Sequence, residues 1–150
     1  MKRVVFFIAI IAIIIAPIFG GEQKFDYQGV EKVCVVSSST LQLENAGIVQ
    51  NGGQIIYSLS IEDYLRQKDL IKDYDGIVLF YPQDTSFDKL KNCWQISWHY
   101  QSEIEGMQIV YAFSPLVEDF LFLNGKKVNL QIAWSQSGVM VGLPLILTGF

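Results

Sequence analysis

The side chains best suited to covalent catalysis in this sequence are its single histidine, His99, and its two cysteines, Cys34 and Cys93. A nucleophilic site needs a nucleophile within hydrogen-bond reach of a base, so any His-dependent site must use His99. Cys93 and His99 are six residues apart on a predicted strand, which separates them by about 20 Å. Pairing of Cys34 with His99 stays open, and no G-x-S-x-G motif occurs. We expect His99 to be a solvent-facing strand residue, and we predict no catalytic residue.

Metal and cofactor chemistry has little support in the residue types. Zinc sites use several Cys or His ligands at set spacing, and three such residues in the whole chain are few. The run Asp73-Tyr-Asp75-Gly76 is similar to the start of a calcium loop, but the later ligands of such a loop are missing. A helix end followed by glycine explains this run better. We therefore predict no metal site and no cofactor.

Paired carboxylates are the one arrangement that points to an enzyme. Glu103 and Glu105 are two residues apart near a predicted strand end, and Glu118 and Asp119 follow a Ser-Pro turn. Two carboxylates at the right separation hydrolyse glycosidic bonds. Acidic turn residues are more often simply solvated. A small extracytoplasmic hydrolase that uses these acids is accordingly the alternative hypothesis.

Aromatic residues recur at every second or fourth position from Trp94 to Tyr100. Trp94, Trp98 and Tyr100 alternate with polar residues, which places them on one face of a predicted strand. Such a stripe can bind a sugar or a partner peptide, although aromatics at this period more often form the core face of a sheet. These three residues are the candidate ligand- or partner-binding site.

The first 20 residues have the order of a secretory signal. Lys2 and Arg3 precede an apolar run from Val4 to Ile15, and Gly20-Gly21 supplies small residues for cleavage. Residues 1–20 are thus predicted to be a signal peptide or, if uncleaved, an N-terminal membrane anchor. We expect a linker over 21–29 and a single extracytoplasmic domain over 30–150, either secreted or held at the outer face of the cytoplasmic membrane.

Export and charge together restrict the partners. An oxidising compartment permits a Cys34–Cys93 disulfide, which would close a loop of about 60 residues and stabilise the fold by roughly 4 kcal/mol. Two free thiols are the equal alternative.

Beyond residue 20 the chain has 15 acidic and 9 basic residues, a net charge of −6. That balance opposes nucleic-acid binding, and membrane contact is expected only through residues 1–20.

The pattern of the domain predicts a mostly antiparallel sheet with one or two helices packed on one face, an α+β fold. Ser60 is expected to cap a helix over 61–73, and Thr85 or Ser86 a shorter one ending at 92. Asn51-Gly-Gly53, Glu105-Gly106 and Asn124-Gly125 predict tight turns. Strands are expected over 30–37, 47–50, 54–58, 76–81, 94–101, 107–113, 128–134 and 139–148.

Three motifs follow one another in the last third of the chain. Ser114-Pro-Leu116 ends an aromatic-rich strand, residues 124–133 read NGKKVNLQIA, and residues 141–148 read VGLPLILT. Residues 111–150, and more weakly the chain back to Asp73, thereby resemble the YwmB family. That resemblance implies an exported protein of Gram-positive-type bacteria with an α+β fold and no established activity. The chain is shorter than typical members, and the label "TATA-box binding" sometimes given to that family is understood as a fold label.

These observations favour a non-enzymatic binding or structural module of the cell envelope. Its partner is expected to be another envelope protein or a cell-wall component.

Overall fold

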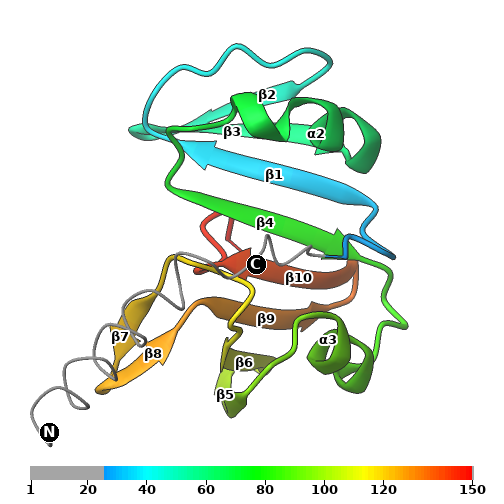
Figure 1. Cartoon of the computed structure of the whole chain (residues 1–150), viewed down its shortest axis with the longest axis vertical. Coiled ribbons are helices and arrows are strands. Elements are labelled where there is room, and N and C mark those ends of the chain that lie inside the picture. Colours follow the sequence, from blue (N-terminus) through cyan, green and yellow to red (C-terminus); the bar gives the residue numbers. More distant parts are fainter. Residues whose placement is uncertain (1–25, 150) are drawn as a thin grey trace, which may run out of the picture.

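The computed structural model describes residues 26–149, in which one strongly twisted eight-stranded sheet dominates (Figure 1). The strand order is β2-β3-β1-β4-β10-β9-β6-β5, and every pairing is antiparallel. The strands are β1 (Lys32–Ser37), β2 (Gly47–Asn51), β3 (Gln54–Ser60), β4 (Gly76–Tyr81), β5 (Trp98–Ile104), β6 (Met107–Phe113), β9 (Leu130–Ser135) and β10 (Gly138–Leu143). A separate hairpin of β7 (Leu121–Leu123) and β8 (Lys126–Val128) projects from the body.

The central strands are rich in β-branched residues, which suit a pleated surface covered on both sides. On β1, Val33 pairs with Leu79 of β4 on one side and with Leu59 of β3 on the other. All three side chains are at most 2% exposed. Burying a side chain of this kind stabilises the fold by about 1.5–3 kcal/mol. The centre of the sheet therefore holds the two edge strands in place.

The two faces of the sheet bear hydrophobic clusters of unequal size. The first face carries the larger cluster, which includes Val35, Leu79, Val110, Ile132 and Val141 from the strands, and Tyr64, Ile71, Leu90 and Trp94 from outside them. The second face carries a smaller cluster of Cys34, Val78, Ile109, Ala133, Met140 and Ile146. Because successive strand residues point to opposite faces, Val33 and Val35 belong to the first face and Cys34 to the second.

The predicted α+β fold, with one or two helices packed on one face, is wrong. Strands make up 45% of the described residues and helices 14%. The helices α2 (Ile61–Gln67) and α3 (Phe87–Cys93) have seven residues each, and α2 continues only as the 3-10 turn η1 (Lys68–Leu70) instead of reaching residue 73. Such short helices add a few buried side chains to the first face, and irregular segments cover much of the rest, so no helical layer forms.

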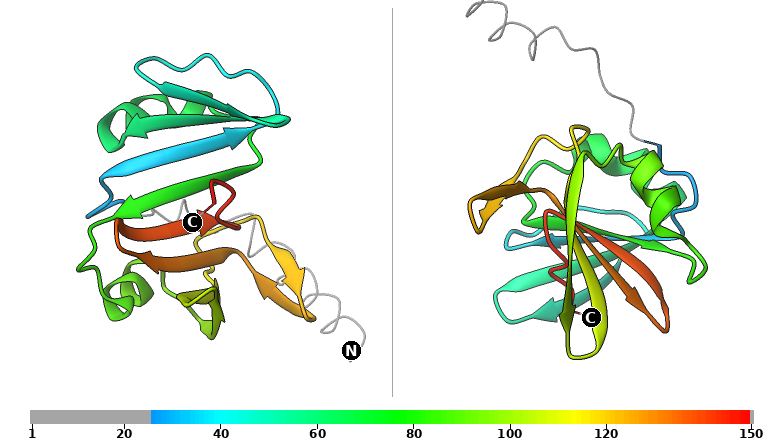
Figure 2. Two further views of the ribbon diagram at one scale, coloured as in Figure 1. Left: turned by 180° about the vertical axis from the view of Figure 1, so that it is seen from behind. Right: turned by 90° about the horizontal axis from the view of Figure 1, so that it is seen from below.

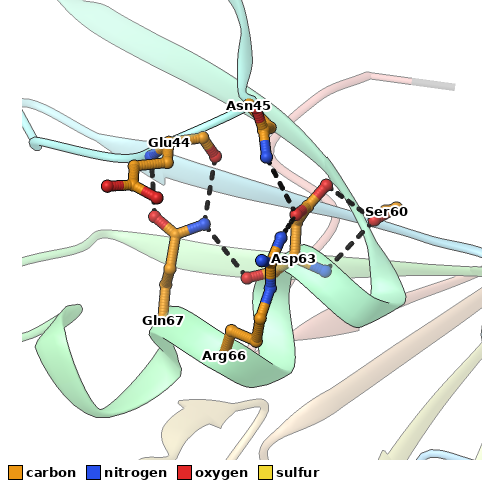
Figure 3. A network of polar contacts seen from close by, with 6 residues as sticks. All are labelled: Glu44, Asn45, Ser60, Asp63, Arg66 and Gln67. Carbon is orange, nitrogen blue, oxygen red and sulfur yellow. Dashed lines mark hydrogen bonds and ion pairs between the residues drawn. The ribbon is translucent and has the colours of Figure 1, made fainter.

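Polar contacts fasten α2 to the segment that leads into β2 (Figure 3). Gln67 is 8% exposed; its amide donates to the backbone oxygens of Glu44 and Asp63 at 3.0 Å each, and its Oε1 accepts from the Glu44 N–H at 2.7 Å. Ser60 caps the helix as predicted, because its hydroxyl accepts from the Asp63 N–H at 3.1 Å. Asp63 also forms an ion pair with Arg66. The network thus holds the approach to β2.

The C-terminal segment folds back over the second face (Figure 2, left). The chain turns at a cis Leu143–Pro144 bond, and Ile146 then joins the smaller cluster. Gln131 fixes the segment, since its Oε1 accepts from the Ile146 N–H at 2.8 Å. A Cβ on Gly142 would lie 2.3 Å from the backbone of Ile146, so only glycine allows this approach. The polar residue Gln131 of β9 is consequently buried.

The predicted signal or anchor over 1–20 lies outside the described residues. The described part of the predicted linker is ordered against the domain: the Tyr27 ring contacts Tyr64 edge-on at 5.8 Å between centroids, and its carbonyl accepts from the Val30 N–H at 3.1 Å. Over residues 26–149, none of the helices has the length and apolar content needed to cross a bilayer.

Candidate functional site

Trp94 is a core residue and does not form a binding stripe with Trp98 and Tyr100. Its side chain is 1% exposed, and its indole Nε1 donates to the Tyr81 hydroxyl at 3.3 Å. The strand predicted from residue 94 begins only at Trp98, because α3 extends to Cys93 and Trp94 is its C-cap residue. Trp94 therefore supports the sheet from inside and cannot reach a partner.

Trp98 and Tyr100 lie on the second face, where Tyr111 of β6 completes a row of three half-buried rings, the aromatic row. The ring centroids of Trp98 and Tyr100 are 6.1 Å apart with 6° between the planes, and those of Tyr100 and Tyr111 are 5.1 Å apart with 21°. Tyr100 and Tyr111 are direct cross-strand partners, which accounts for their contact. At the end of the row, the Lys126 ammonium lies 5.5 Å from the Trp98 ring, a cation–π contact.

Hydrogen bonds anchor the aromatic row to the C-terminal segment. Gln131 Nε2 donates to the Tyr111 hydroxyl at 3.3 Å, while the same amide binds the Ile146 N–H. Desolvation, together with the neighbouring Tyr111, raises the pKa of Tyr100. A tyrosine hydroxyl is protonated at neutral pH with or without this shift, so Tyr100 can donate a hydrogen bond.

Strand β5 is an edge of the sheet, with β6 as its only strand partner among residues 26–149. Glu105 (φ 51°) and Gly106 (φ 79°) form a two-residue turn between Ile104 and Met107, which are paired. In such a hairpin the residues flanking the turn exchange both main-chain hydrogen bonds, and the pattern then alternates along the strand. Counting back from Ile104, the peptide groups of residues 99, 101 and 103 point away from β6. Within the described part of the chain, they form a row of donors and acceptors with no main-chain partner along the edge.

A buried polar clamp fixes the approach to β5 and the exit from β6. The Ser114 hydroxyl donates to the Trp94 carbonyl, and the Ser114 N–H donates to Asn129 Oδ1 at 2.7 Å. Asn129 Nδ2 in turn donates to the carbonyls of Ser114 at 2.7 Å and Val117 at 3.0 Å. Both side chains are fully buried. Two residues of the motifs that resemble the YwmB family thus have a structural role here.

The first-face side of β5 carries His99. Its ring lies 4.6 Å from the Phe87 ring of α3, and Phe87 contacts Trp134 edge-on at 6.2 Å. His99 is exposed, in agreement with the expectation for a strand histidine. Cys34 faces the opposite side of the sheet, five strands away, which corresponds to about 24 Å. A Cys34–His99 catalytic pair is therefore excluded.

Two open depressions border the β5–β6 turn. One of about 560 Å³ is lined by Gln83, Glu105, Gly106, Met107, Trp134, Ser135 and Gln136. The other, of about 460 Å³, is lined by Gln101, Ser102, Glu103, Gly106 and Gln108. Glu103 and Glu105 are exposed and line different depressions. Glu118 and Asp119 are also exposed. Burial raises the pKa of Tyr74, and the negative charges of Asp119 and Glu118 raise it further. The four acids therefore form no common site.

The cysteines correspond to the second sequence-based alternative, two free thiols. Cys34 is buried in the smaller cluster, with its sulfur 3.4 Å from the Ser58 hydroxyl. Cys93 is half-buried against the larger cluster, on the other side of the sheet. A disulfide requires Cα atoms within about 7 Å, which opposite faces do not provide.

Sequence reasoning missed three features of this region. The strand predicted over 107–113 contains Tyr111 but does not indicate its place in the aromatic row, and the Asn124-Gly125 turn does not indicate that Lys126 contacts Trp98. Phe122 is 65% exposed on the projecting hairpin, where it contacts Phe120 edge-on at 5.6 Å. Alternation within the strand predicted over 107–113 indicates the face of Tyr111 but not which strands are its neighbours, and no strand was predicted over residues 121–123.

An S-x-x-K spacing at Ser86 and Lys89 was also overlooked. The Ser86 hydroxyl accepts from the Lys89 N–H at 3.2 Å as the N-cap of α3, and both side chains are exposed. This arrangement starts a helix and does not bury a lysine beside a nucleophile.

Within residues 26–149, no group of three or more His, Cys, Asp or Glu side chains is placed to hold a metal ion. The chain gives no match to a family model, to a curated protein or to a solved structure.

Proposed function

We propose that this protein is an exported envelope protein of the YwmB type that binds an extended segment of a partner protein along β5 and catalyses no reaction. The observation that carries the proposal is the row of outward peptide groups at residues 99, 101 and 103 beside the aromatic row. An added strand gains affinity from main-chain hydrogen bonds and specificity from its alternate side chains. The outer edge of β5 supplies the main-chain hydrogen bonds, and Trp98 and Tyr100 supply side-chain contacts that give specificity.

A cell-wall glycan is a poorer fit to the aromatic row. Sugars stack on an open ring face, whereas the rings of Trp98 and Tyr100 are stacked on each other. Lys126 lies over Trp98 at the end of the row. Half-buried aromatic rings with occupied faces are better suited to contacts with apolar side chains of a peptide.

The hydrolase alternative has no geometric support strong enough to be proposed. A general acid in a glycosidase lies in surroundings that exclude water and raise its pKa. Glu103 and Glu105 are exposed and border different open depressions.

Export is supported by the charged, apolar and small-residue order of residues 1–20. The intact mass of the protein recovered from the producing cell tests it. A mass lacking residues 1–20 indicates a secreted domain, and a full-length mass in the membrane fraction indicates an anchored one. Full-length protein in the cytosol contradicts export.

Site-specific photo-crosslinking in the producing cell tests strand addition. Benzoylphenylalanine replaces Gln101 on β5, Gln50 on the opposite edge strand β2, or Glu62 on α2; all three side chains are exposed. We expect a discrete adduct from position 101 and none from position 62. The adduct yield from position 50 measures how much protein associates with an exposed sheet edge without specificity. No adduct from position 101, or equal adducts from 101 and 62, overturns the proposal.

A further inference from the structure

We infer that the strand received by β5 is β5 of a second copy of this chain, antiparallel about a two-fold axis at Gln101. The inference rests on the proposed function, because it names the partner of the same edge. A two-fold interface uses one surface twice, so the strand must be complementary to itself. The residue order of β5, WHYQSEI, meets this requirement.

Antiparallel pairing centred on Gln101 places complementary side chains opposite each other on both faces. On the first face, His99 of one copy lies opposite Glu103 of the other, and this pair occurs twice. An imidazole and a carboxylate form a charge-assisted hydrogen bond. On the second face, Trp98 lies opposite Ile104, and Tyr100 lies opposite Ser102. Every position of the strand therefore has a compatible partner.

The outward peptide groups select this register. Residues 99, 101 and 103 must pair with one another in an added antiparallel strand, so the axis passes through one of residues 99 to 103, at either a hydrogen-bonded or a non-hydrogen-bonded pair. An axis at His99 pairs His99 with itself, and an axis at Glu103 places two carboxylates opposite each other. Like charges directly opposite across strands are destabilising. An axis at Tyr100 or Ser102 leaves part of β5 unpaired and places Gln101 opposite His99 or Glu103. The axis at Gln101 alone pairs His99 with Glu103 twice and uses the full strand.

Ile104 gives independent support for this arrangement. Its side chain is 40% exposed at the end of β5, on the same face as the aromatic row. In the dimer it would lie opposite Trp98 in a non-hydrogen-bonded pair, where side chains approach most closely. The aromatic row of each copy would then extend across the interface.

Disulfide trapping of the full-length chain in its native membranes or culture tests the register. At the axis, two Gln101→Cys residues have Cα atoms about 5.5 Å apart, within disulfide range. His99→Cys lies about 13 Å from its own copy and cannot bridge. The matched control is Gln50→Cys, an exposed glutamine at the equivalent outward position of the other edge. The unsubstituted chain measures any crosslinking by Cys34 and Cys93.

We expect a disulfide-linked dimer from Gln101→Cys at least tenfold above that from His99→Cys, Gln50→Cys and the unsubstituted chain. Chains carrying His99→Cys and Glu103→Cys, produced together, should form the mixed dimer. Equal yields from all variants overturn the inference. No trapped dimer, together with a photo-adduct between position 101 and a different protein, overturns the second copy as partner but leaves the proposed function intact.

A charge exchange tests the pairing independently of cysteine geometry. In the Gln101→Cys background, Glu103→Lys places a cation opposite His99 and should lower the dimer yield roughly three- to tenfold. Adding His99→Glu restores opposite charges and should recover the yield. If the dimer yield does not recover although the monomer stays folded, the proposed register is wrong.

Discussion

The two edges of the eight-stranded sheet expose different chemistry. Strand β2 carries Ile48 and Val49, which are 64% and 59% exposed and point to opposite faces, and it has no charged residue. Strand β5 carries half-buried Trp98 and Tyr100 on one face, backed by Tyr111, and charged or polar residues on the other. Both strands have two-residue turns and exposed outer sides, so the difference lies in the side chains.

This difference affects specificity more than adhesion. An apolar edge without charges pairs in many registers, which makes β2 an aggregation hazard. On β5, only the two-fold register centred on Gln101 pairs His99 with Glu103 and Trp98 with Ile104, and the register centred on Glu103 places two carboxylates opposite each other. We therefore attribute specific association to β5 and unspecific adhesion to β2.

The largest expected effect comes from the core support of β5. Trp94→Ala removes a buried indole and its hydrogen bond to Tyr81, so the free energy of unfolding should fall by about 3–5 kcal/mol. Urea denaturation followed by circular dichroism measures it. Trp98→Ala is the control, because Trp98 is half-buried in the aromatic row and should cost clearly less. Equal losses would contradict the placement of one tryptophan inside and the other at the edge.

The second largest loss of stability is expected from the hydrogen bonds that support the β2 edge. Gln67→Ala leaves the Glu44 N–H and two backbone carbonyls without their partner, which should lower the free energy of unfolding by about 1–3 kcal/mol. Glu62→Ala, at an exposed position on the same helix, should stay within about 0.5 kcal/mol. Hydrogen exchange should quicken at residues 44–51 in Gln67→Ala. Unchanged exchange there would show that the network does not hold β2.

Much of the local structure could be predicted from the sequence. Period-two alternation identified β6, the Asn51-Gly-Gly53 and Glu105-Gly106 turns were found where expected, and Ser60 and Ser86 cap helices. These features depend on neighbours along the chain, so local patterns suffice. The length of α2 was overestimated because Ile71 and Tyr74 continue the helical spacing, although Ile71 is buried as a loop residue.

The candidate site depended on information that the sequence pattern does not carry. Trp94 and Trp98 are both tryptophans in the same alternating pattern. Trp94 nevertheless ends a helix in the core, whereas Trp98 starts an edge strand. The strand order decides that β5 is an edge, that Tyr111 stacks on Tyr100, and that Cys34 and Cys93 lie on opposite faces. Each depends on long-range pairing, which alternation within a single strand leaves open.

A proline substitution in either edge strand tests the difference between β5 and β2 with little loss of stability. Gln101→Pro removes an N–H that points away from β6, so the free energy of unfolding should change by no more than about 1 kcal/mol. It should nevertheless abolish association through β5. Gln50→Pro makes the same change on β2 and should reduce aggregation on heating while leaving β5 pairing intact. Sedimentation velocity and light scattering during a thermal ramp separate the two outcomes. Loss of association in both variants would mean that the edges act alike.

The smallest effect concerns two buried tyrosines, one on α2 and one at the end of β4. Burial raises the pKa of Tyr64, on α2, and of Tyr81, at the end of β4 beside Trp94, above the ordinary value of 10.0. A raised folded-state pKa contributes stability that is complete below about pH 10 and is lost as the pH rises further. At pH 10.5 the loss should be about 0.8 kcal/mol per tyrosine.

Urea denaturation at pH 8, 9.5 and 10.5 measures this dependence. Tyr64→Phe should flatten the alkaline decline, and it also removes the hydrogen bond between the Tyr64 and Tyr27 side chains. Tyr81→Phe should flatten it equally but start lower at every pH, because the Trp94 indole loses its acceptor. If only one of the two variants flattens the decline, the tyrosine whose replacement has no effect is open to water in the folded protein.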